Sequence, residues 1–428
     1  MKQNNLTGTF LFQPPETAPV GSILYEEHLK LTGKSHMAAF AGYLMPLWYS
    51  SIAAEHKAVR EAAGLFDCTH MGVLEVAGPD AAEFLNTIAT NEVSNLKPGS
   101  AKYSYIPDAA GNVLDDIIIY ALAQDRFMVV VNAANEPKIK AYLHGLQNDR
   151  VIIDAETPKR KLQYKPTIRD MRDPKNNDDC RVDIALQGPK SIDLLSKLTD
   201  KENLASIENL KPFHLIKPQV QNIDCIIART GYTGAKTGFE LFVHPAKAPQ
   251  LWTVLLQSGQ PLGLLPCGLG ARDSLRIEAG LPLYGHELAG EFNISPFEAG
   301  YGWAVKLEKE FFIGKAAMTA KSLTYDMMVA RIELPGQKGV RPVRQNDGVL
   351  GNSGRCAGWV LSCAKVGEKQ IALAYVSREG IKENDLVGIY YLARSQSQIS
   401  QGRKQSIEKA GSLQADITGM VVSRFAKF

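Results

Sequence analysis

The chain has 428 residues, of which 45% are hydrophobic and 22% are charged. This length predicts roughly two to four domains, and the composition excludes a chain that is disordered as a whole. Lysine and arginine number 48 against 45 acidic residues, and the net charge of +3 excludes a general nucleic-acid or anionic-membrane binder on charge alone.

The cysteines and histidines do not follow any metal-binding pattern. Six cysteines are present and none are spaced as Cys-x-x-Cys, while the eight histidines include no His-x-x-x-His pair. We therefore expect reduced thiols, no metal site and a cytoplasmic location. Residues 1–20 contain no apolar core of a signal peptide. The longest uncharged stretch, 36–54, contains Gly42 and Pro46, so we expect no membrane span.

The first part of the chain predicts an antiparallel α+β sheet. Helical spacing covers 25–31, 51–63 and 136–146, and strand patterns cover 72–77, 101–107, 113–121 and 127–131. Another helix follows Asp80, which we expect to cap it together with Glu83. Strands that follow one another directly, with helices beside them, favour α+β over alternating β-α-β units.

A polar stretch, 156–181, interrupts this pattern, and we expect a surface loop or insertion. It carries five basic residues with no acid among them: Lys159, Arg160, Lys161, Lys165 and Arg169. Such a run is either a docking patch for an acidic partner or a solvated loop.

The second part begins with a similar mixture and then becomes all-β. Strands are expected at 182–186, 223–229 and 239–243, and helices at 190–198, 248–258 and 270–278. From residue 327 onward, short β runs alternate with glycine-rich turns, which predicts a C-terminal β domain. Within it, the Gln/Ser-rich stretch 394–411 is typical of a loop.

Asp115 and Asp116 form an acid pair on an otherwise apolar strand. Adjacent strand residues point to opposite faces, so one aspartate can face a cleft while the other faces outward. A buried aspartate must find donors or a cation. The alternative is a turn-end aspartate that accepts nearby backbone N–H groups.

Two further clusters could bind a ligand. The turn 229–234 places Tyr232 between two glycines, and Glu240 follows in an apolar strand. The alternative is a hairpin turn with a packed tyrosine. Arg272 and Arg276 lie four residues apart near a helix start, where they could bind carboxylates or pair with nearby acids. Neither a dinucleotide-binding nor a P-loop motif is present.

Together these segments resemble the T-protein family of the glycine cleavage system, the tetrahydrofolate-dependent aminomethyltransferases. The segments that carry the resemblance, in chain order, are 40–46, 65–72, 111–116, 131–135, 186–189, 229–234, 268–273, 283–285 and 296–300. The resemblance covers most of residues 24–317.

The resemblance implies an α+β fold with three domains in a cloverleaf, antiparallel sheets flanked by helices, and a C-terminal β-barrel. We expect residues 22–322 to form the folate-binding region, as two interwoven α+β domains, and residues 323–428 to form the barrel. Compared with the family, the insertion 156–181 is long and the stretch 394–411 is unusual.

The resemblance also implies the chemistry. Aminomethyl-dihydrolipoyl H-protein would donate a methylene group to tetrahydrofolate, the co-substrate, with release of ammonia and without a metal. Asp116 matches the family's key acid. The matching folate contacts are Tyr103, Asn132, Tyr232, Glu240 and Arg272. The basic run in 159–169 would then be a candidate surface for the acidic H-protein.

Two alternatives stay open at the level of the sequence. A tetrahydrofolate-dependent demethylase of a small O- or S-methyl donor would share the folate cradle and differ in the donor pocket. A folate-binding accessory protein would lack transfer activity, but that branch carries a Lys-Gly-Cys-Tyr signature that residues 276–286 lack. The presence of Asp116 also disfavours the accessory protein.

Overall fold

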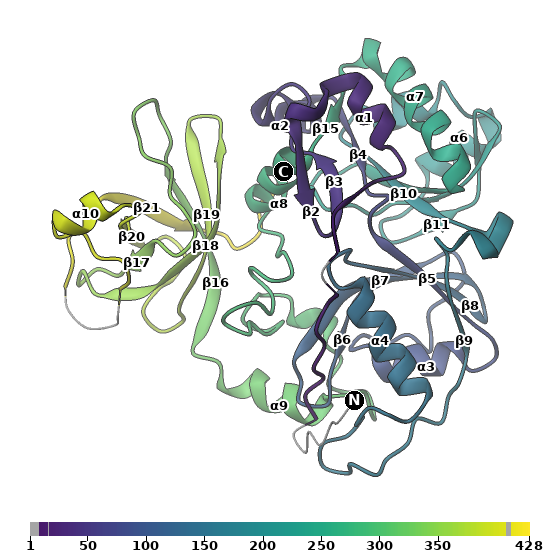
Figure 1. Ribbon diagram of the computed structural model, residues 1–428, viewed down its shortest axis with the longest axis horizontal. Coiled ribbons are helices and arrows are strands. Elements are labelled where there is room, and N and C mark those ends of the chain that lie inside the picture. Colours follow the sequence, from purple (N-terminus) through teal and green to yellow (C-terminus); the bar gives the residue numbers. More distant parts are fainter. Residues whose placement is uncertain (1–7, 16, 408–411) are drawn as a thin grey trace. The chain divides into compact units, whose positions relative to one another are not determined.

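The structure is a computed structural model that describes residues 8–15, 17–407 and 412–428. Residues 1–7, 16 and 408–411, which belong to the segments 1–20 and 394–411 discussed above, lie outside this description. Two compact units emerge: Met1–Arg272 with Trp303–Ala320, and Asp273–Gly302 with Lys321–Phe428. Figure 1 labels most of their helices and strands. The expected boundary at 322/323 stays a prediction.

The first unit contains a five-stranded sheet in which every neighbouring pair is antiparallel. Its strands, in spatial order, are β6 (Ala101–Pro107), β7 (Val113–Ala123), β8 (Arg126–Val131), β5 (Gly72–Ala77) and β9 (Thr167–Asp170). Helices α3 (Ala81–Ile88) and α4 (Glu136–Gln147) pack on one face of this sheet.

A second, seven-stranded sheet belongs to the same unit. Its strands, in spatial order, are β11 (Leu215–Ile216), β13 (Ile223–Ala228), β14 (Gly238–Val243), β10 (Val182–Gln187), β4 (Ala63–Asp67) and β15 (Leu264–Cys267), with β12 (Gln219–Val220) paired to β13. Only β4 and β15 pair in parallel within this described sheet. Its helices are α2 (Ile52–Glu61), α5 (Ser191–Leu195), α6 (Lys201–Glu208) and α7 (Ala248–Gly259). Helix α8 (Leu269–Ala279) follows β15, and the first unit ends within it at Arg272.

The two sheets pack face to face and enclose an apolar layer, here called the inter-sheet layer. It joins side chains from β5 to β8 with side chains from β11, β13 and β14. Because side chains alternate along a strand, the other face of each sheet packs on its own helices. Polar residues on the inward faces are therefore enclosed between two sheets.

The start of the chain adds a small sheet of β1 (Val20–Gly21), β3 (Tyr43–Pro46) and β2 (Met37–Phe40), beside helix α1 (Tyr25–Thr32). Short 3-10 helices cover Lys34–His36, Pro174–Asp179, Pro245–Lys247, Gln260–Leu262 and Gly302–Ala304. Helix α9 spans Lys315–Thr324. Among the helices described, none has the length and apolarity that crossing a membrane requires.

The second unit contains a closed barrel of antiparallel strands. Their order around the barrel is β16 (Met327–Pro335), β19 (Lys369–Ser377), β18 (Cys356–Val366), β17 (Gly348–Leu350), β20 (Leu386–Tyr390) and β21 (Ile417–Val422). β21 closes the barrel by pairing with β20 and with β16. The predicted α+β fold with a C-terminal barrel is confirmed.

The stretch 156–181 was expected to be a surface loop or insertion, and strand β9 within it, which extends the sheet at β5, excludes a simple loop. Two local predictions are wrong. Asp80 precedes α3 but makes no capping bond, since its backbone is already helical. The described part of 394–411 contains helix α10 (Gln396–Ser400), because Ser395 accepts the N–H of Gln398 and caps it.

Candidate active site

A tight turn positions the aspartate pair at the start of β7. The carboxylate of Asp108 accepts the N–H of Asn112 at 2.9 Å, and its carbonyl accepts the N–H of Gly111 at 2.9 Å. Gly111 has a φ of +72°, and a Cβ there would lie 2.8 Å from Cβ of Ala317, so glycine is required. The turn fixes where β7 begins and therefore which face each aspartate occupies.

The two aspartates point to opposite faces of the sheet. Asp115 lies opposite Ile106, which belongs to the helix-side core. Asp116 shares its face with Tyr120 and points into the inter-sheet layer. The expectation that one of the pair faces outward is wrong, because Asp115 is fully buried and Asp116 is half-buried.

One amide links the two carboxyl groups. Nδ2 of Asn132 donates to Oδ1 of Asp115 and to Oδ1 of Asp116, both at 2.8 Å. The backbone N–H of Asn132 donates to Oδ2 of Asp115 at 2.9 Å, and Asn135 adds a third bond to Asp115. Asn132 follows β8 and Asn135 precedes α4, so the strand–helix connection holds the pair.

Because both carboxyl groups are close together and removed from water, it is unfavourable for Asp115 and Asp116 to be ionised at the same time. Burial and the negative charge of Asp116 raise the pKa of Asp115 to about 8, against the hydrogen bonds from Asn132 and Asn135. Burial also raises the pKa of Asp116, against the hydrogen bonds from Tyr103 and Asn132. We therefore expect one proton on Asp115 near neutral pH and the negative charge on Asp116.

Tyr103 comes from the neighbouring strand β6. Its hydroxyl donates to Oδ2 of Asp116 at 2.9 Å. Its ring lies edge-on to Tyr105, with centroids 5.3 Å apart, and tilted against Trp303 at 5.9 Å. Trp303 is 53% exposed, so an aromatic wall extends from Asp116 to the surface of the first unit.

Glu240 lies on β14, across the inter-sheet layer from β7. Its Oε2 accepts the hydroxyl of Tyr120 at 2.8 Å and also accepts the hydroxyl of Thr230. Tyr120 follows Asp116 by four residues on the same face of β7. The inter-sheet layer therefore contains both Glu240 and Asp116, and strand β7 connects them.

Arg272 and Tyr232 lie beside Glu240. The guanidinium of Arg272 lies 5.2 Å from the ring centroid of Tyr232, and its Nη1 donates to Sγ of Cys68 at 3.1 Å. Burial acts to lower the pKa of Arg272, but the negative groups around it, including Glu240, raise it above its ordinary value. Arg272 is therefore a permanent cation in a layer rich in acids.

Gln187 holds the loop that carries Tyr232. Its Nε2 donates to the carbonyls of Thr230 and Phe239, and its Oε1 accepts the hydroxyl of Thr233 at 2.9 Å. A Cβ on Gly231 would lie 2.1 Å from Oε1 of Gln187, so glycine permits this close approach.

Arg276 does not share the role that the spacing suggested for Arg272. In the second unit, it donates to Asp273 at 2.8 Å, to Glu287 at 2.6 Å and to Ser362 at 2.9 Å. Arg276 is 1% exposed and Glu287 is fully buried. For Arg276, the pairing with nearby acids is the correct alternative.

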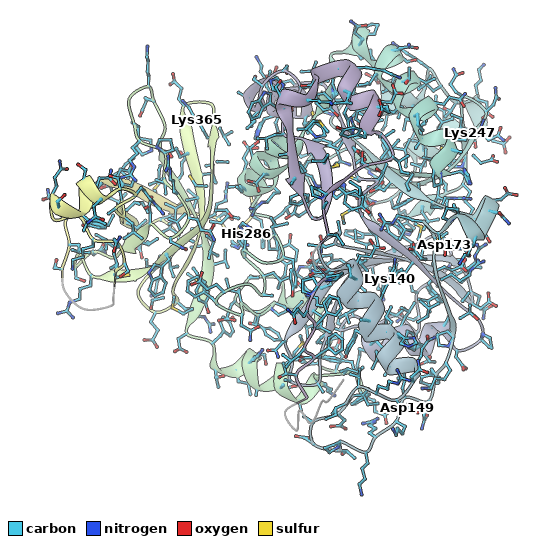
Figure 2. All side chains as sticks on the ribbon, viewed as in Figure 1. Lys140, Asp149, Asp173, Lys247, His286 and Lys365 are labelled. Carbon is cyan, nitrogen blue, oxygen red and sulfur yellow. The ribbon has the colours of Figure 1, made fainter. Side chains whose placement is uncertain are left out.

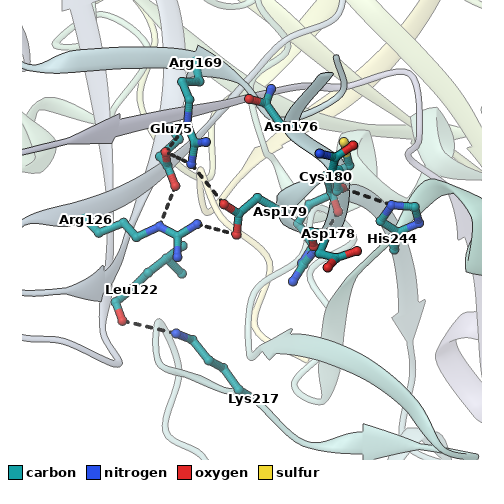
Figure 3. Close-up of polar contacts among 12 residues, drawn as sticks. Glu75, Leu122, Arg126, Arg169, Asn176, Asp178, Asp179, Cys180, Lys217 and His244 are labelled. Carbon is teal, nitrogen blue, oxygen red and sulfur yellow. Dashed lines mark hydrogen bonds and ion pairs between the residues drawn. The ribbon is translucent and has the colours of Figure 1, made fainter. Parts of the chain in front are cut away.

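The basic run in the polar stretch is largely neutralised by acids from other segments. Arg169 and Arg126 both bind Glu75 and Asp179, and these four residues form a closed ion-pair network (Figure 3). Lys165 binds Asp149, which Figure 2 labels, at 3.0 Å. Arg160 binds Asp154 at 3.3 Å and stacks on Phe311. The absence of acids within the run was therefore a misleading signal.

A cavity of about 690 Å³ lies elsewhere in the first unit. Its walls come from Gly21, Ile23, Tyr43, Thr69, Asp170, Arg172, Pro174, Asn177, Asp178, Cys180, Val182, His244, Pro245 and Ala246. The predicted site residues are not among them. Arg172 in its wall is already paired with Glu136 and bonded to Tyr43.

Sequence reasoning missed several polar residues of the inter-sheet layer. Tyr120 could have been found, because it shares a strand face with Asp116. Thr230 lies in the turn 229–234 that the sequence singles out, while Cys68 and Asp183 had no such signal, since their neighbours come from distant segments. In the described part of the chain, no group of three or more His, Cys, Asp or Glu side chains is arranged to hold a metal ion.

Comparisons with known proteins identify the family of the chain. The family model described as "GCVT N-terminal domain" matches residues 24–309. An aminomethyltransferase of Streptomyces avermitilis is 44% identical over 284 residues, which cover 66% of this chain and 69% of that protein. An aminomethyltransferase of Symbiobacterium thermophilum is 39% identical over 364 residues, which cover 82% and 88%.

A solved structure extends the likeness to nearly the whole chain. The crystal structure of glycine cleavage system aminomethyltransferase T from Bartonella henselae matches with a TM-score of 0.72 and 30% identity. The match covers 94% of this chain and 96% of that one.

Proposed function

This chain belongs to the aminomethyltransferase family of the glycine cleavage system, and on that premise we propose that it transfers methylene from an aminomethyl-dihydrolipoyl H-protein to tetrahydrofolate with release of ammonia. It is a transferase of glycine catabolism. We assign Asp116 as the principal acid and Tyr103, Asn132, Tyr232, Glu240 and Arg272 as folate contacts. The proposed location is the cytoplasm.

The proposed catalytic role of Asp116 depends on its carboxylate being fixed in position and ionised. Tyr103 and Asn132 donate to its two oxygens, and the proton that we expect on Asp115 would leave the negative charge of the pair on Asp116. A fixed, half-buried carboxylate can orient an attacking nitrogen and stabilise positive charge that develops there. This requires no protein nucleophile, because the nitrogen of tetrahydrofolate makes the attack.

The residues around Glu240 suit the polar edge of a pterin. A carboxylate accepts paired N–H groups, a tyrosine offers a flat apolar contact, and a guanidinium binds a carbonyl or carboxylate. Glu240, Tyr232 and Arg272 provide these three groups within the first unit.

The first test measures ammonia release with tetrahydrofolate and aminomethyl-loaded H-protein. Asp116→Asn removes the charge but keeps the shape, and we expect kcat to fall by ~10²–10³-fold, the range for one preorganised electrostatic group. Circular dichroism should show an unchanged fold. Turnover of a small methyl donor, with none from loaded H-protein, would instead establish the demethylase alternative.

The second test measures tetrahydrofolate binding by calorimetry. Glu240→Gln and Arg272→Ala should each weaken binding by ~1–3 kcal/mol, as expected for charge-assisted hydrogen bonds. Asp193→Asn, which changes an exposed residue of α5, is the control. Unchanged affinity with a lowered melting temperature would show that these residues serve only the core.

A further inference from the structure

Tyr120 reaches from one sheet to the other inside the inter-sheet layer. It lies on β7 and is fully buried, and its ring is edge-on to Phe242 of β14 with centroids 5.3 Å apart. Its hydroxyl donates to Oε2 of Glu240 at 2.8 Å. The packed ring therefore fixes the point at which this buried hydroxyl meets Glu240.

Thr230 supplies a second donor to the same oxygen, from the loop that carries Tyr232. The hydroxyl of Thr230 also donates to Oε2 of Glu240, and it lies 3.1 Å from the hydroxyl of Tyr120. The carbonyl of Thr230 accepts Nε2 of Gln187, so the backbone here is held independently of the threonine side chain. Thr230 and Glu240 are both buried, so water has little access to replace either hydroxyl.

The two hydroxyls occupy one oxygen of Glu240 and leave the other available. A carboxylate oxygen has two lone pairs, and two donors fill both lone pairs of Oε2. No side chain or backbone group in the described part of the chain donates a hydrogen bond to Oε1. Because the carboxylate is planar, the bonds that hold Oε2 also fix the direction in which Oε1 points.

The arrangement at Glu240 differs from that of a carboxyl group that serves the core. At Asp115 the donors are spread over both oxygens, since Oδ1 accepts the amides of Asn132 and Asn135 and Oδ2 accepts the N–H of Asn132. A buried carboxyl group is best satisfied in this way. At Glu240 the protein satisfies one oxygen only, which leaves Oε1 as an acceptor for a ligand.

We propose that Tyr120 and Thr230 are positioning residues that bind Oε2 of Glu240 and thereby hold Oε1 toward the N–H groups of the pterin ring. The two hydroxyls act through Glu240 and do not contact the ligand. The inference deepens the proposed function and rests on it, because its ligand is tetrahydrofolate.

Steady-state kinetics with tetrahydrofolate and loaded H-protein test this role. Tyr120→Phe removes one hydroxyl and keeps the packed ring, so the KM for tetrahydrofolate should rise by about tenfold while kcat stays within about twofold of the wild type. Tyr142→Phe is the matched control. Tyr142 is also fully buried, and its hydroxyl donates to the carbonyl of Pro107 at 3.0 Å in the helix-side core. The KM of this control should not change.

Thr230 offers a pair of variants that separates the hydroxyl from the methyl group. Thr230→Ser keeps the hydroxyl and should keep the KM within about twofold of the wild type. Thr230→Val keeps the shape without the hydroxyl and should raise the KM by about tenfold. Packing alone would give the opposite order, because valine preserves the methyl group and serine lacks it, and that order would overturn the proposal.

A double variant tests whether Tyr120 acts through Glu240. Titration calorimetry with tetrahydrofolate measures binding without turnover. Once Glu240→Ala has removed the carboxylate, the addition of Tyr120→Phe should weaken binding by less than about twofold more. A further tenfold loss would overturn the proposal, since the hydroxyl would then act on the ligand by another route.

Two other outcomes would also overturn the proposal. An unchanged KM for Tyr120→Phe and Thr230→Val, with lowered melting temperatures, would assign both hydroxyls to the core alone. A fall in kcat with an unchanged KM would mean that the variant disturbs Asp116 along β7. A wild type that does not turn over loaded H-protein would instead overturn the proposed function, and that failure is recognised without any variant.

Discussion

Asp115 and Asp116 are adjacent in sequence, but the sheet gives them different surroundings. Asp115 is enclosed by the amides of Asn132 and Asn135, while Asp116 keeps one side toward the inter-sheet layer and Tyr103. The difference in chemistry follows from the alternation of side chains along β7. It explains why a single acid of the pair is assigned to catalysis.

Asp115→Asn should therefore have a small effect at neutral pH. The wild-type residue is expected to be protonated there, and asparagine has the same shape, so kcat should stay within about tenfold of the wild type. The pKa of Asp115 is raised to about 8, and any change in kcat/KM near that pH should disappear in the variant. A loss equal to that of Asp116→Asn would contradict the separate roles.

Asp67 allows a prediction about stability and pH. Burial acts to raise its pKa, but hydrogen bonding and charge from His28, with help from His70 and Ser22, lower the pKa from the ordinary 3.8 to about 2. Folding therefore favours the ionised form. The resulting stability of about 2 kcal/mol is fully present above pH 4 and is lost as the pH falls through 2.

Urea unfolding between pH 5 and pH 2 measures this contribution. The difference in free energy of unfolding between the wild type and Asp67→Asn should shrink by about 2 kcal/mol over that range. A difference that does not change with pH would mean that Asp67 stabilises the fold by packing alone.

At the scale of elements, β9 is a strand that the sequence alone did not predict. The strand is four residues long, and it pairs with β5, which lies about ninety positions earlier in the chain. Its Arg169 and the neighbouring Arg126 are held by Glu75 and Asp179, which come from separate segments (Figure 3). Longer apolar strands such as β7 were predictable from their own residues.

The network around Glu75 should stabilise this edge of the sheet. Glu75 is 1% exposed and bonds both arginines, so Glu75→Gln should lower the free energy of unfolding by about 2–3 kcal/mol. Asp179 bonds the same arginines at 43% exposure, and Asp179→Asn should cost less than about 1 kcal/mol. Equal losses in urea unfolding would argue against a special role for the buried member.

At the scale of the whole molecule, the predictable parts were those with local signals. The antiparallel sheet, the barrel and the family could be inferred from alternating patterns and motif order. The bond between Glu240 and Tyr120 could not, because it forms through the packing of two sheets, nor could the bond between Arg272 and Cys68, because their segments are joined only by the pairing of β4 with β15. The four-residue spacing of Arg272 and Arg276 was misleading, since Arg276 binds Asp273 and also Glu287, and Glu287 lies in a later loop.

Contacts within the second unit allow a prediction about the residue at which the barrel domain begins. Phe292 stacks on Trp359 with ring centroids 5.6 Å apart and lies 5.4 Å from Tyr375, and Glu298 accepts the hydroxyl of Tyr375. A fragment of residues 273–428 should therefore melt at a higher temperature than one of residues 323–428, by circular dichroism. Equal melting temperatures would favour the boundary at 322/323.

The closure of the barrel also has a consequence during synthesis. β16 pairs with β21, yet the end of β16 at residue 335 and the start of β21 at 417 are separated by most of the domain. At ~5–20 residues per second, a ribosome takes roughly 4–16 s to translate that interval. Meanwhile β16 and β20 each lack a neighbour, and unpaired edges invite association with other chains. Association through these unpaired strand edges would occur first between nascent chains on the same polysome. The speed of translation after residue 335 should therefore influence how much of the protein forms the closed barrel.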